Sequence, residues 1–320
     1  MEVYNTYYQK GFIEGIAQKL ITFGEATGNT LLLTNIASTG HYEYNAFFNR
    51  LTSLSNRRDI SDTSTALTPV TLTQASNTGV KLNRYMTPVQ MTEDAFKKIG
   101  KDPGEMVYDV GVMAGQDRIQ EYINTTLTAL ANALANQSST NYTSVCAAST
   151  TTMTATNLNT GLTLMGDRAS DVRFLVMHSK VYHDLIAQAI SDKIYEEAGR
   201  VVYGGVPGTF GRPVYVTDSD SLVTTDGTNT AYYTLGLTEG AAIVNQSEPD
   251  SVLVEKIGGY HNIMTRIQSE YAYNLKLKGF EWDTSNGGIN PTTANVATGS
   301  NWDIVVTSYK NLPGIVIKSL

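Results

Sequence analysis

The segment from Asp102 to about Asn136 predicts one very long helix, and this feature restricts the fold more than any other. Apolar residues recur along it at spacings of three and four, which is the pattern of a helix with one buried face. Asp102 suits the N-cap, Pro103 the first helical position and Glu105 the return position of a capping box. At about 1.5 Å per residue the helix is roughly 50 Å long, so we expect an elongated domain.

A second long element is predicted from Asn262 to Lys278, where two kinds of residue alternate. The apolar set predicts a buried face and consists of Ile263, Ile267, Tyr271, Tyr273, Leu275 and Leu277. The polar set includes Asn274 and Lys276. A period of two indicates a half-buried strand, here also roughly 50 Å long. A long helix on a long strand makes a thin plate that buries little of its own surface, which predicts a subunit that completes its burial against neighbours.

Composition argues against a protein that reads nucleic-acid sequence. The chain has 320 residues, of which 41% are hydrophobic and only 17% are charged, below the ~25% usual for soluble domains. The net charge is −7 and no run of Lys or Arg is longer than a pair, so the basic surface of a sequence-reading nucleic-acid-binding protein is missing. A protein that only encloses nucleic acid is compatible with a mildly acidic wall, because such a wall repels phosphate.

The residues also predict the compartment in which the protein is made. Cys146 is the single cysteine, so neither an intrachain disulfide nor a Cys-based zinc site is expected. The first residues lack the basic region and apolar run of a signal peptide. No apolar stretch approaches the ~18–20 residues that span a membrane. We expect a soluble protein made in a cytoplasm, without membrane contact.

No catalytic or metal site is predicted. His178 and His183 are too far apart in the sequence to share one helix face. Cys146 has no histidine near it in the sequence, and no Gly-x-Ser-x-Gly elbow occurs. The glycine-rich stretch 204–211 precedes a strand-like segment rather than a helix, so it predicts a tight turn and not a phosphate-binding loop. We therefore expect no enzyme, no cofactor and no metal ion.

Residues 40–86 predict a projecting hairpin. Their hydrophobic signal is too weak for a self-sufficient sheet, and a return strand is expected at residues 68–73 and 80–85, ending at Pro88. A two-stranded hairpin is marginally stable alone in water, so we expect it to pack on a neighbouring subunit through ion pairs worth ~0–1 kcal/mol each. The candidate interface residues are Arg50, Arg57, Arg58, Asp59, Asp62, Lys81 and Arg84.

The remaining segments predict an N-terminal element and a second lobe. The amphipathic residues 11–21 precede a glycine-rich hinge at residues 24–30; they fit an arm over another surface and an ordinary N-terminal helix equally well. The lobe is expected from a buried strand at 173–177 and a helix at 180–190, with a polar surface loop at 218–230. Further strands are expected at 232–235, 241–244, 252–254 and 314–317.

The order of these segments resembles a known family. After the hairpin and the long helix come FLVMHSKVYHDLI at residues 174–186, GTFGRPVYVTD at 208–218 and the long returning strand. Together they resemble the major capsid proteins of tailed bacteriophages, which have the Hong Kong 97 fold. The segment at 279–305, GFEW…GGINPTTANVATGSNWDIV, resembles one branch of those coat proteins. The resemblance extends from about residue 40 to the end of the chain.

The resemblance implies an α+β fold with a long spine helix, long antiparallel strands and an extended hairpin called the E-loop. It divides the chain into an N-terminal arm (1–38), the E-loop hairpin (39–88), a P-domain with the spine helix (89–144), an A-domain (145–258), and a return to the P-domain with a C-terminal segment (259–320). It implies no catalytic residue. Lys81 is the one lysine of the hairpin, and we expect no covalent cross-link through it.

The resemblance also implies partners. Copies of the chain would assemble as hexamers and pentamers into an icosahedral shell that encloses double-stranded DNA non-specifically, together with a portal protein. Residues 1–38 are too few for a fused scaffolding domain, so a separate scaffolding protein is implied. The protein would be made in the cytoplasm of a bacterial host and end in the virion. The alternatives are an encapsulin-like compartment with the same fold and a Thr-rich adhesin, which would need a signal peptide.

Overall fold

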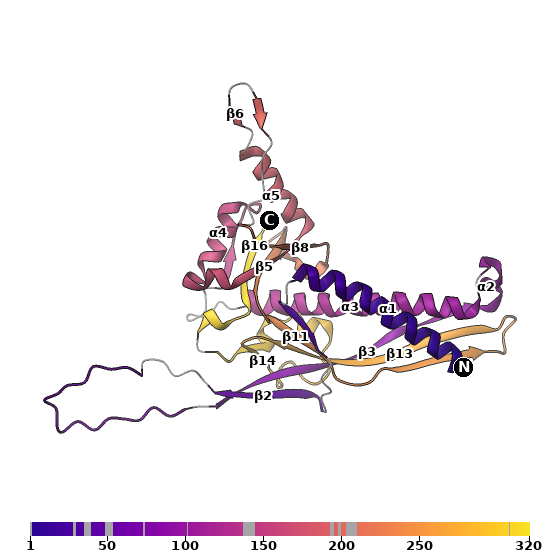
Figure 1. The fold of residues 1–320 in the computed structure, drawn as a ribbon, viewed down its shortest axis with the longest axis horizontal. Coiled ribbons are helices and arrows are strands. Elements are labelled where there is room, and N and C mark those ends of the chain that lie inside the picture. The colour runs from indigo at the N-terminus through magenta and orange to yellow at the C-terminus, as the bar shows by residue number, and fades with distance from the viewer. Residues whose placement is uncertain are drawn as a thin grey trace.

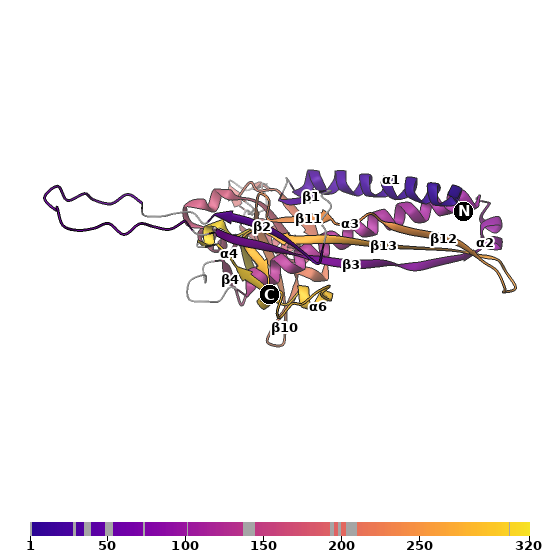
Figure 2. The same cartoon turned by 90° about the horizontal axis from the view of Figure 1, so that it is seen from below.

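The protein is an elongated plate with a lobe on one side and a loop that projects beyond one end (Figure 1). The computed structural model describes residues 2–27, 30–34, 40–48, 54–72, 74–100, 102–136, 145–192, 195–197, 200–202, 210–306 and 308–320. Figure 2, turned by 90°, shows that the plate and the loop follow the same long axis. The loop therefore adds to the length of the molecule and not to its thickness.

The long helix is confirmed. The α-helices of the described residues are α1 (Glu2–Thr27), α2 (Glu93–Ile99), α3 (Pro103–Ala135), α4 (Ala155–Thr163), α5 (Ser179–Asp192) and α6 (Thr293–Val296). Helix α3 has 33 residues, and the Asp102 side chain caps its first turn by accepting a hydrogen bond from the Gly104 amide, 3.0 Å away. Helix α1 continues through the predicted hinge at Gly24 because a single glycine costs a helix only ~1 kcal/mol.

One six-stranded sheet forms the floor of the plate. Its order is β1-β11-β13-β3-β2, and β12 also pairs with β13. The strands are β1 (Leu31–Thr34), β2 (Tyr42–Phe48), β3 (Gln74–Thr92), β11 (Ala242–Gln246), β12 (Ser251–Ile257) and β13 (Met264–Leu277). The predicted long strand is confirmed as β13. Strands β11 and β12 lie within residues 145–258, which the resemblance assigns to the A-domain, yet they pair with β13.

Strand β3 differs from the prediction at both ends. Residues 68–72 are not in a strand, and β3 begins at Gln74 and continues past Pro88 to Thr92. The strand tolerates the proline because its pairing with β13 is irregular there: Met86 pairs with Ser269 and Val89 with Ile267, so one extra β3 residue lies between the two pairs. Bulges and edge positions are where a strand accommodates proline.

The polar face of β13 is buried where the sequence predicts exposure. From Ala272 to Leu277 every residue is buried, with Asn274 at 1% and Lys276 at 5% exposure. The alternation of apolar and polar residues therefore persists, but it separates two buried faces. The polar face is tolerated because its side chains bind a carboxylate, that of Glu43 on β2.

The second sheet builds the lobe. Its order is β4-β16-β10-β5-β8, with β9 also on β10. The strands are β4 (Cys146–Ala148), β5 (Val172–His178), β8 (Val214–Thr217), β9 (Val223–Asp226), β10 (Asn229–Thr238) and β16 (Gly314–Ser319), and two short ladders pair β6 (Tyr195–Glu197) with β7 (Arg200–Val202) and β14 (Phe280–Trp282) with β15 (Trp302–Ile304). The predicted strand and helix at 173–177 and 180–190 are confirmed by β5 and α5.

The predicted polar loop at 218–230 is wrong. Most of it is a hairpin of β9 and β10 that turns at Gly227, whose φ is +62°. An Asp-Gly pair between two strands is a strong hairpin signal. The strand character is hidden in the sequence because these Thr and Asp side chains are largely exposed, which removes the hydrophobic alternation. Of the glycine-rich stretch 204–211, residues 204–209 lie outside the described residues.

Helix α1 packs on α3 of the same chain, backbone against backbone. The two helices run in the same direction, and glycines line the contact: Gly11, Gly15, Gly111 and Gly115. A Cβ at Gly11 would lie 2.2 Å from the Tyr108 carbonyl oxygen, and one at Gly111 would lie 2.4 Å from that of Tyr8. No side chain fits at such distances, so the glycines are what allow the helices to approach. The N-terminal residues thus belong to the body of their own subunit as a helix.

Helix α1 also closes a small core of its own. Tyr8 is 1% exposed and packs with Val107, Val254 and Ile267 from α3, β12 and β13. The main core lies between α3 and the sheets, and it includes Leu127, Leu130, Tyr273 and the edge-to-face pair Trp282–Trp302. A third core fills the lobe. The buried residues thus form one large and two smaller clusters along the extended body.

Replacement of Asp102 by alanine should lower the free energy of unfolding by ~1 kcal/mol, because the first turn of α3 loses its cap. Urea unfolding followed by circular dichroism measures the change. Asp102→Asn is the matched control, since an asparagine oxygen can accept the same hydrogen bond from Gly104. Equal losses for both substitutions would contradict the capping role.

Candidate assembly surfaces

The loop between β2 and β3 is described from residue 54 to residue 72, and over this range no other part of the chain covers it. All of these residues are exposed. Several are apolar, including Ile60 at 86% and Leu67 at 93% exposure, together with Leu54, Val70 and Leu72. Apolar side chains gathered on an exposed segment indicate a surface that binds a partner. These apolar residues occur too sparsely in the sequence to form a periodic pattern, so they were not among the predicted interface residues.

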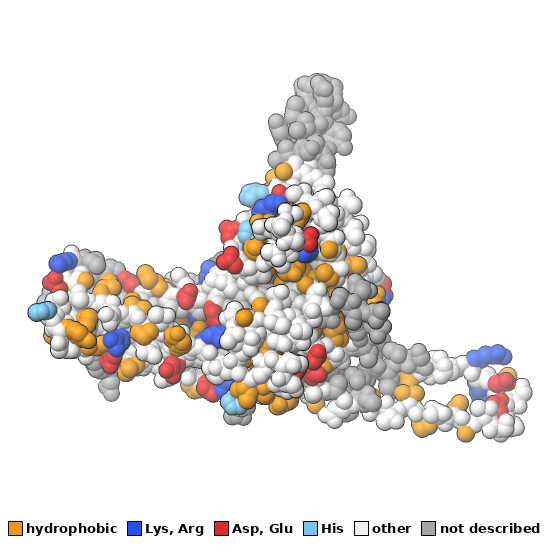
Figure 3. All heavy atoms as spheres, turned by 180° about the vertical axis from the view of Figure 1, so that it is seen from behind, with side chains coloured by type: hydrophobic (Ala, Val, Ile, Leu, Met, Phe, Trp, Pro, Cys, Tyr) orange, Lys and Arg blue, Asp and Glu red, His pale blue; other side chains and the backbone are white. Residues whose placement is uncertain are grey.

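Charged residues occupy the end of this projecting loop (Figure 3). Arg57, Arg58, Asp59 and Asp62 are all exposed. Asp62 accepts hydrogen bonds from the backbone amides of Ser64 and Thr65, 2.9 and 3.0 Å away. Hydrogen bonds from the side chain of Thr65 and from these amides lower the pKa of Asp62 to about 2. Both signs of charge are therefore present at the end of the loop at neutral pH.

The structure separates the predicted interface residues into two groups. Arg57, Arg58, Asp59 and Asp62 project from the body, whereas Lys81 and Arg84 lie on β3 and bind their own chain. Lys81 forms an ion pair with Glu248 and is 7% exposed. The Arg84 Nε lies 3.0 Å from a Glu121 carboxylate oxygen. Arg50 lies outside the described residues.

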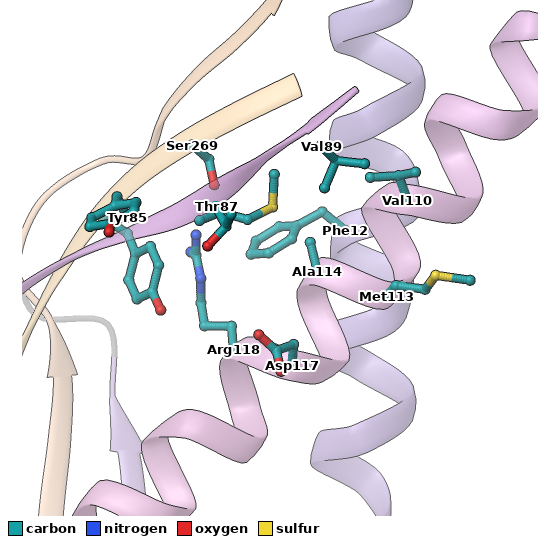
Figure 4. Close-up of a pocket in the computed structure, with 12 residues that line it drawn as sticks. Phe12, Tyr85, Thr87, Val89, Val110, Met113, Ala114, Asp117, Arg118 and Ser269 are labelled. Atoms are coloured by element: carbon teal, nitrogen blue, oxygen red, sulfur yellow. The ribbon is translucent and has the colours of Figure 1, made fainter. Parts of the chain in front are cut away.

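A groove lies between α3 and β3 on the plate (Figure 4), at residues 85–89 of β3, whereas the loop joins β3 at Gln74. Its volume is about 550 Å³. Its exposed apolar side chains are Tyr85 and Val89 of β3 and Met113 of α3. Met113 follows Val110 by three residues and so belongs to the apolar positions that the helix pattern predicts to be buried, but it is 68% exposed at the rim of the groove. The apolar positions of α3 form a stripe that is wider than the surface covered by the sheet. The sequence alone does not decide which of these positions lies at the edge of the stripe and is exposed.

Arg118 lines the groove, and its charge is balanced by an ion pair. It is 5% exposed, and its guanidinium lies between the rings of Phe12 and Tyr271, 4.3 and 3.9 Å from their centroids. Its Nη1 lies 2.5 Å from the Asp250 carboxylate. Stacking on two aromatic rings and pairing with a carboxylate stabilise a buried guanidinium. The groove thus combines apolar side chains with the polar Thr87, Ser269 and Asp117, and the charge of Arg118 is balanced by Asp250.

A second polar cluster ties α3 to the sheet behind the groove. Glu121 accepts hydrogen bonds from the hydroxyls of Tyr271 and Tyr273, 3.0 and 2.8 Å away, as well as from Arg84. Burial and the Glu121 charge raise the pKa of both tyrosines. The phenols therefore stay protonated at neutral pH and continue to donate to Glu121.

Ser179, His178 and Asp218 lie close together but do not have the geometry of a catalytic triad. Ser179 Oγ donates to the Asp218 carboxylate, and His178 Nε2 lies 4.0 Å from the same carboxylate. A catalytic triad needs the serine bonded to the histidine, which removes its proton. Within the described ranges, no three His, Cys, Asp or Glu side chains are close enough to hold a metal ion. No helix of those ranges is long and apolar enough to cross a membrane.

Comparison with solved structures identifies the fold. It is similar to the capsid of Ralstonia phage GP4, with a TM-score of 0.54 over 91% of this chain and 87% of that chain at 11% identity. It is similar to a chain of Microbacterium phage Oxtober96, with a TM-score of 0.50 over 77% and 83% at 13% identity. A chain of the Cyanophage Pam1 capsid asymmetric unit gives a TM-score of 0.50 over 75% and 81% at 11% identity. These identities are low, so the likeness concerns the fold.

The sequence itself identifies the family. No curated protein matches it significantly, but the profile described as "Major capsid protein 13-like" matches residues 1–316, almost the whole chain. The plate with its spine helix α3, the projecting loop and the lobe are the parts of the Hong Kong 97 fold. The chain therefore belongs to the Gp13-like major capsid protein family and is a structural subunit of a phage capsid.

Proposed function

We propose that this capsid subunit assembles through its projecting loop, which lies on the plate of a neighbouring copy. The observation that supports this most directly is the position of the exposed apolar residues. Five of them, Leu54, Ile60, Leu67, Val70 and Leu72, lie on the loop that projects beyond one end of the plate (Figure 1), whereas the residues that line the groove belong to α1, α3, β3 and β13 of the plate. In this proposal residues 39–88 act as the E-loop, 89–144 and 259–320 as the P-domain with the C-terminal segment, and 145–258 as the A-domain.

The geometry favours head-to-tail contacts. The loop extends away from its own groove, so another copy must supply the groove that it meets. Such a contact joins two different surfaces, and repetition of it closes a ring when the rotation between copies allows closure. Hexamers and pentamers are such rings, and together they close an icosahedral shell around double-stranded DNA. A scaffolding protein and a portal protein complete the proposed assembly, which takes place in the bacterial cytoplasm.

Many weak contacts would stabilise the shell. Exposed ion pairs at the end of the loop contribute only ~0–1 kcal/mol each, and the apolar contacts of a single loop are also limited. Because each subunit is held by several neighbours at once, the effective concentration of every contact is high. The role of the chain is then mechanical, without a catalytic step.

Negative-stain electron microscopy tests this function. We expect closed shells of uniform diameter when the chain is expressed with its scaffolding partner. Shells formed by the chain alone would show that a scaffold is not needed and would correct that part of the proposal. Monomers alone, under every salt and scaffold condition, would overturn the proposal.

The double substitution Arg57→Glu and Arg58→Glu should abolish or strongly reduce shell formation without changing the melting temperature of the monomer. Both side chains are exposed, so the fold does not depend on them, while their reversal replaces the positive charge at the end of the loop by negative charge. Electron microscopy counts the shells and differential scanning fluorimetry gives the melting temperature. Arg173→Glu is the control, because Arg173 is also exposed but lies in the lobe. Normal shells with the double variant would contradict a role for these charges.

A further inference from the structure

A buried ion pair holds the root of the projecting loop. Glu43 lies on β2, the strand that leads into the loop, and Lys276 lies on β13, two strands away in the sheet. Lys276 Nζ lies 2.5 Å from Glu43 Oε1, and the two side chains are 6% and 18% exposed. An ammonium in such a position needs an opposite charge beside it, because burial removes its hydration. The pair therefore couples β2 to β13.

Gly79 of the intervening strand β3 makes this contact possible. Glu43 pairs with Gly79, and Lys276 follows Leu275, the partner of Val80. The Lys276 side chain passes over Gly79, where a Cβ would lie only 2.5 Å from its Cγ. Adjacent strands are ~4.8 Å apart. A side chain of β13 reaches β2 because it is long and because the β3 residue between them has no side chain.

Glu43 gathers donors from two further positions. Asn245 Nδ2 and Asn274 Nδ2 lie 3.0 and 3.3 Å from its second oxygen, Oε2. The side-chain amide of Asn45 lies against the Lys276 ammonium. A single carboxylate thus connects β2 with β11 and β13 on one face of the sheet.

The rest of β2 is held less firmly. Tyr44, Asn45 and Ala46, which follow Glu43, are exposed. Beyond Glu43 the strand depends on its backbone pairing with β3, which extends to Phe48. Strand β3 itself has an additional and longer partner in β13, from Val80 to Thr92. The two strands at the root of the loop therefore differ in how strongly the plate holds them.

We propose that Glu43 and Lys276 form a latch that fixes the direction in which the projecting loop leaves the body. With the latch closed, β2 is clamped to β13 across Gly79. With the latch open, β2 and the loop root turn relative to the plate while β3 stays paired with β13. The importance of this direction for shells rests on the proposed function, but the latch is a property of the single chain.

The latch is expected to open in acid. Burial disfavours the charged form of Glu43, but the Lys276 ammonium and the two asparagine amides outweigh it, so the pKa of Glu43 is below its ordinary value. A carboxyl group with a lowered folded pKa stabilises the fold above its unfolded pKa, and this contribution is lost as the pH falls through the folded pKa. The adjacent charged groups are Lys81 and Glu248, which pair with each other. The latch is therefore closed at neutral pH.

Hydrogen exchange of the unassembled chain tests the latch. At pH 7, Glu43→Gln should reduce the protection of the β2 amides by about tenfold or more, while the amides that pair β3 with β13 stay protected. In the wild type the same loss should appear on acidification, after correction for intrinsic exchange rates, and the variant should show no such step. Glu255→Gln is the matched control, since Glu255 pairs with Arg266 at the surface of the same sheet.

A distance measurement reports the direction of the loop. Spin labels at Thr65→Cys on the loop and Glu105→Cys on α3, in a Cys146→Ala background, should give a broader distance distribution with Glu43→Gln than without it. Unchanged β2 protection together with an unchanged distribution would overturn the proposal. Because no shell is needed, the latch is tested separately from assembly: a chain with a working latch that forms no shells would refute the proposed function alone.

A double-mutant cycle covers the case in which Glu43→Gln fails to fold. Lys276→Met removes the ammonium, and the double variant leaves neither charge buried. We expect the double variant to fold and to lose no more β2 protection than the more affected single variant. Losses that simply add would overturn the latch, because the two side chains would then act independently.

Discussion

Gly111→Leu should lower the free energy of unfolding by ~3 kcal/mol and release α1 from α3, because overpacking of this size costs ~1–3 kcal/mol or more. Even a Cβ at this position would lie 2.4 Å from the Tyr8 carbonyl oxygen and 3.0 Å from the Phe12 nitrogen. Backbone atoms within a helix cannot move aside singly, so α1 must shift as a unit. Its displacement would expose Tyr8, which is buried in the wild type. Urea unfolding gives the free energy, and hydrogen exchange shows whether α1 alone loses protection.

Gly258→Ala is the matched control for this prediction. No atom lies within 4 Å of the place where its Cβ would be, so stability should remain within ~0.5 kcal/mol of the wild type. If Gly111→Leu left both the unfolding midpoint and the protection of α1 unchanged, the glycine contact would not be what holds the helix. The same experiment with Gly15→Leu, where a Cβ would lie 2.2 Å from the Val112 carbonyl oxygen, repeats the test from the side of α1.

Arg118→Ala should lower the free energy of unfolding by ~3–5 kcal/mol, the usual cost of removing one partner of a buried ion pair. The substitution leaves the Asp250 carboxylate, 19% exposed, without its guanidinium. It also removes the group that lies between the rings of Phe12 and Tyr271, so α1, α3 and β13 lose a common contact. The urea midpoint should fall accordingly.

Two variants make this result specific. Arg266→Ala breaks a pair with Glu255 in which both side chains are 39% exposed, and it should cost no more than ~1 kcal/mol. Arg118→Lys keeps the charge but loses the planar group that stacks on two rings, so it should restore only part of the stability. A loss for Arg118→Ala as small as that for Arg266→Ala would show that the buried pair and the stack contribute little.

The long elements were predictable because their signals are local and repeated. In α3 the capping residues and the spacing of apolar residues agree over 33 residues, and the helix begins at Pro103 as expected. In β13, which has 14 residues, apolar and polar residues alternate over most of the strand. An agreement of cap, propensity and periodicity over such a length leaves few competing structures. The lobe strand β5 was equally clear because it is a short apolar run between polar residues.

The β9–β10 hairpin was not predicted because β9 and the first residues of β10 are mostly Thr, Asp and Asn, so hydrophobic alternation is absent where the two strands meet at the turn. The Asp226-Gly227 turn was the available signal, and its flanking Thr residues favour strands. The predicted bounds of β3 were wrong at both ends, and at its C-terminal end the reason is Pro88, which usually ends a strand. A bulge opposite Ile267 and Ser269 absorbs the proline, and only the partner strand determines whether a bulge can form.

The candidate sites depended on tertiary structure even more. The sequence does not distinguish the seven charged residues that were predicted around the hairpin. In the structure Lys81 and Arg84 bind Glu248 and Glu121 of their own chain. Arg57 and Asp62, in contrast, are exposed. The latch residues carried no sequence signal at all. Glu43 and Lys276 are far apart along the chain, and their meeting needs Gly79 on the strand between them.

The sequence by itself determined the length of the plate, through α3 and β13, and the capsid family, through the order of its segments. Tertiary structure alone decided three features: α1 lies on α3 of its own chain, the Met113 side chain is exposed to solvent, and the polar face of β13 is buried. The physical reason is the range of each effect. Caps and periodicity act within a few residues of one segment, whereas the fit of two glycine-lined helices and the neutralisation of a buried lysine depend on atoms that only the folded chain brings together.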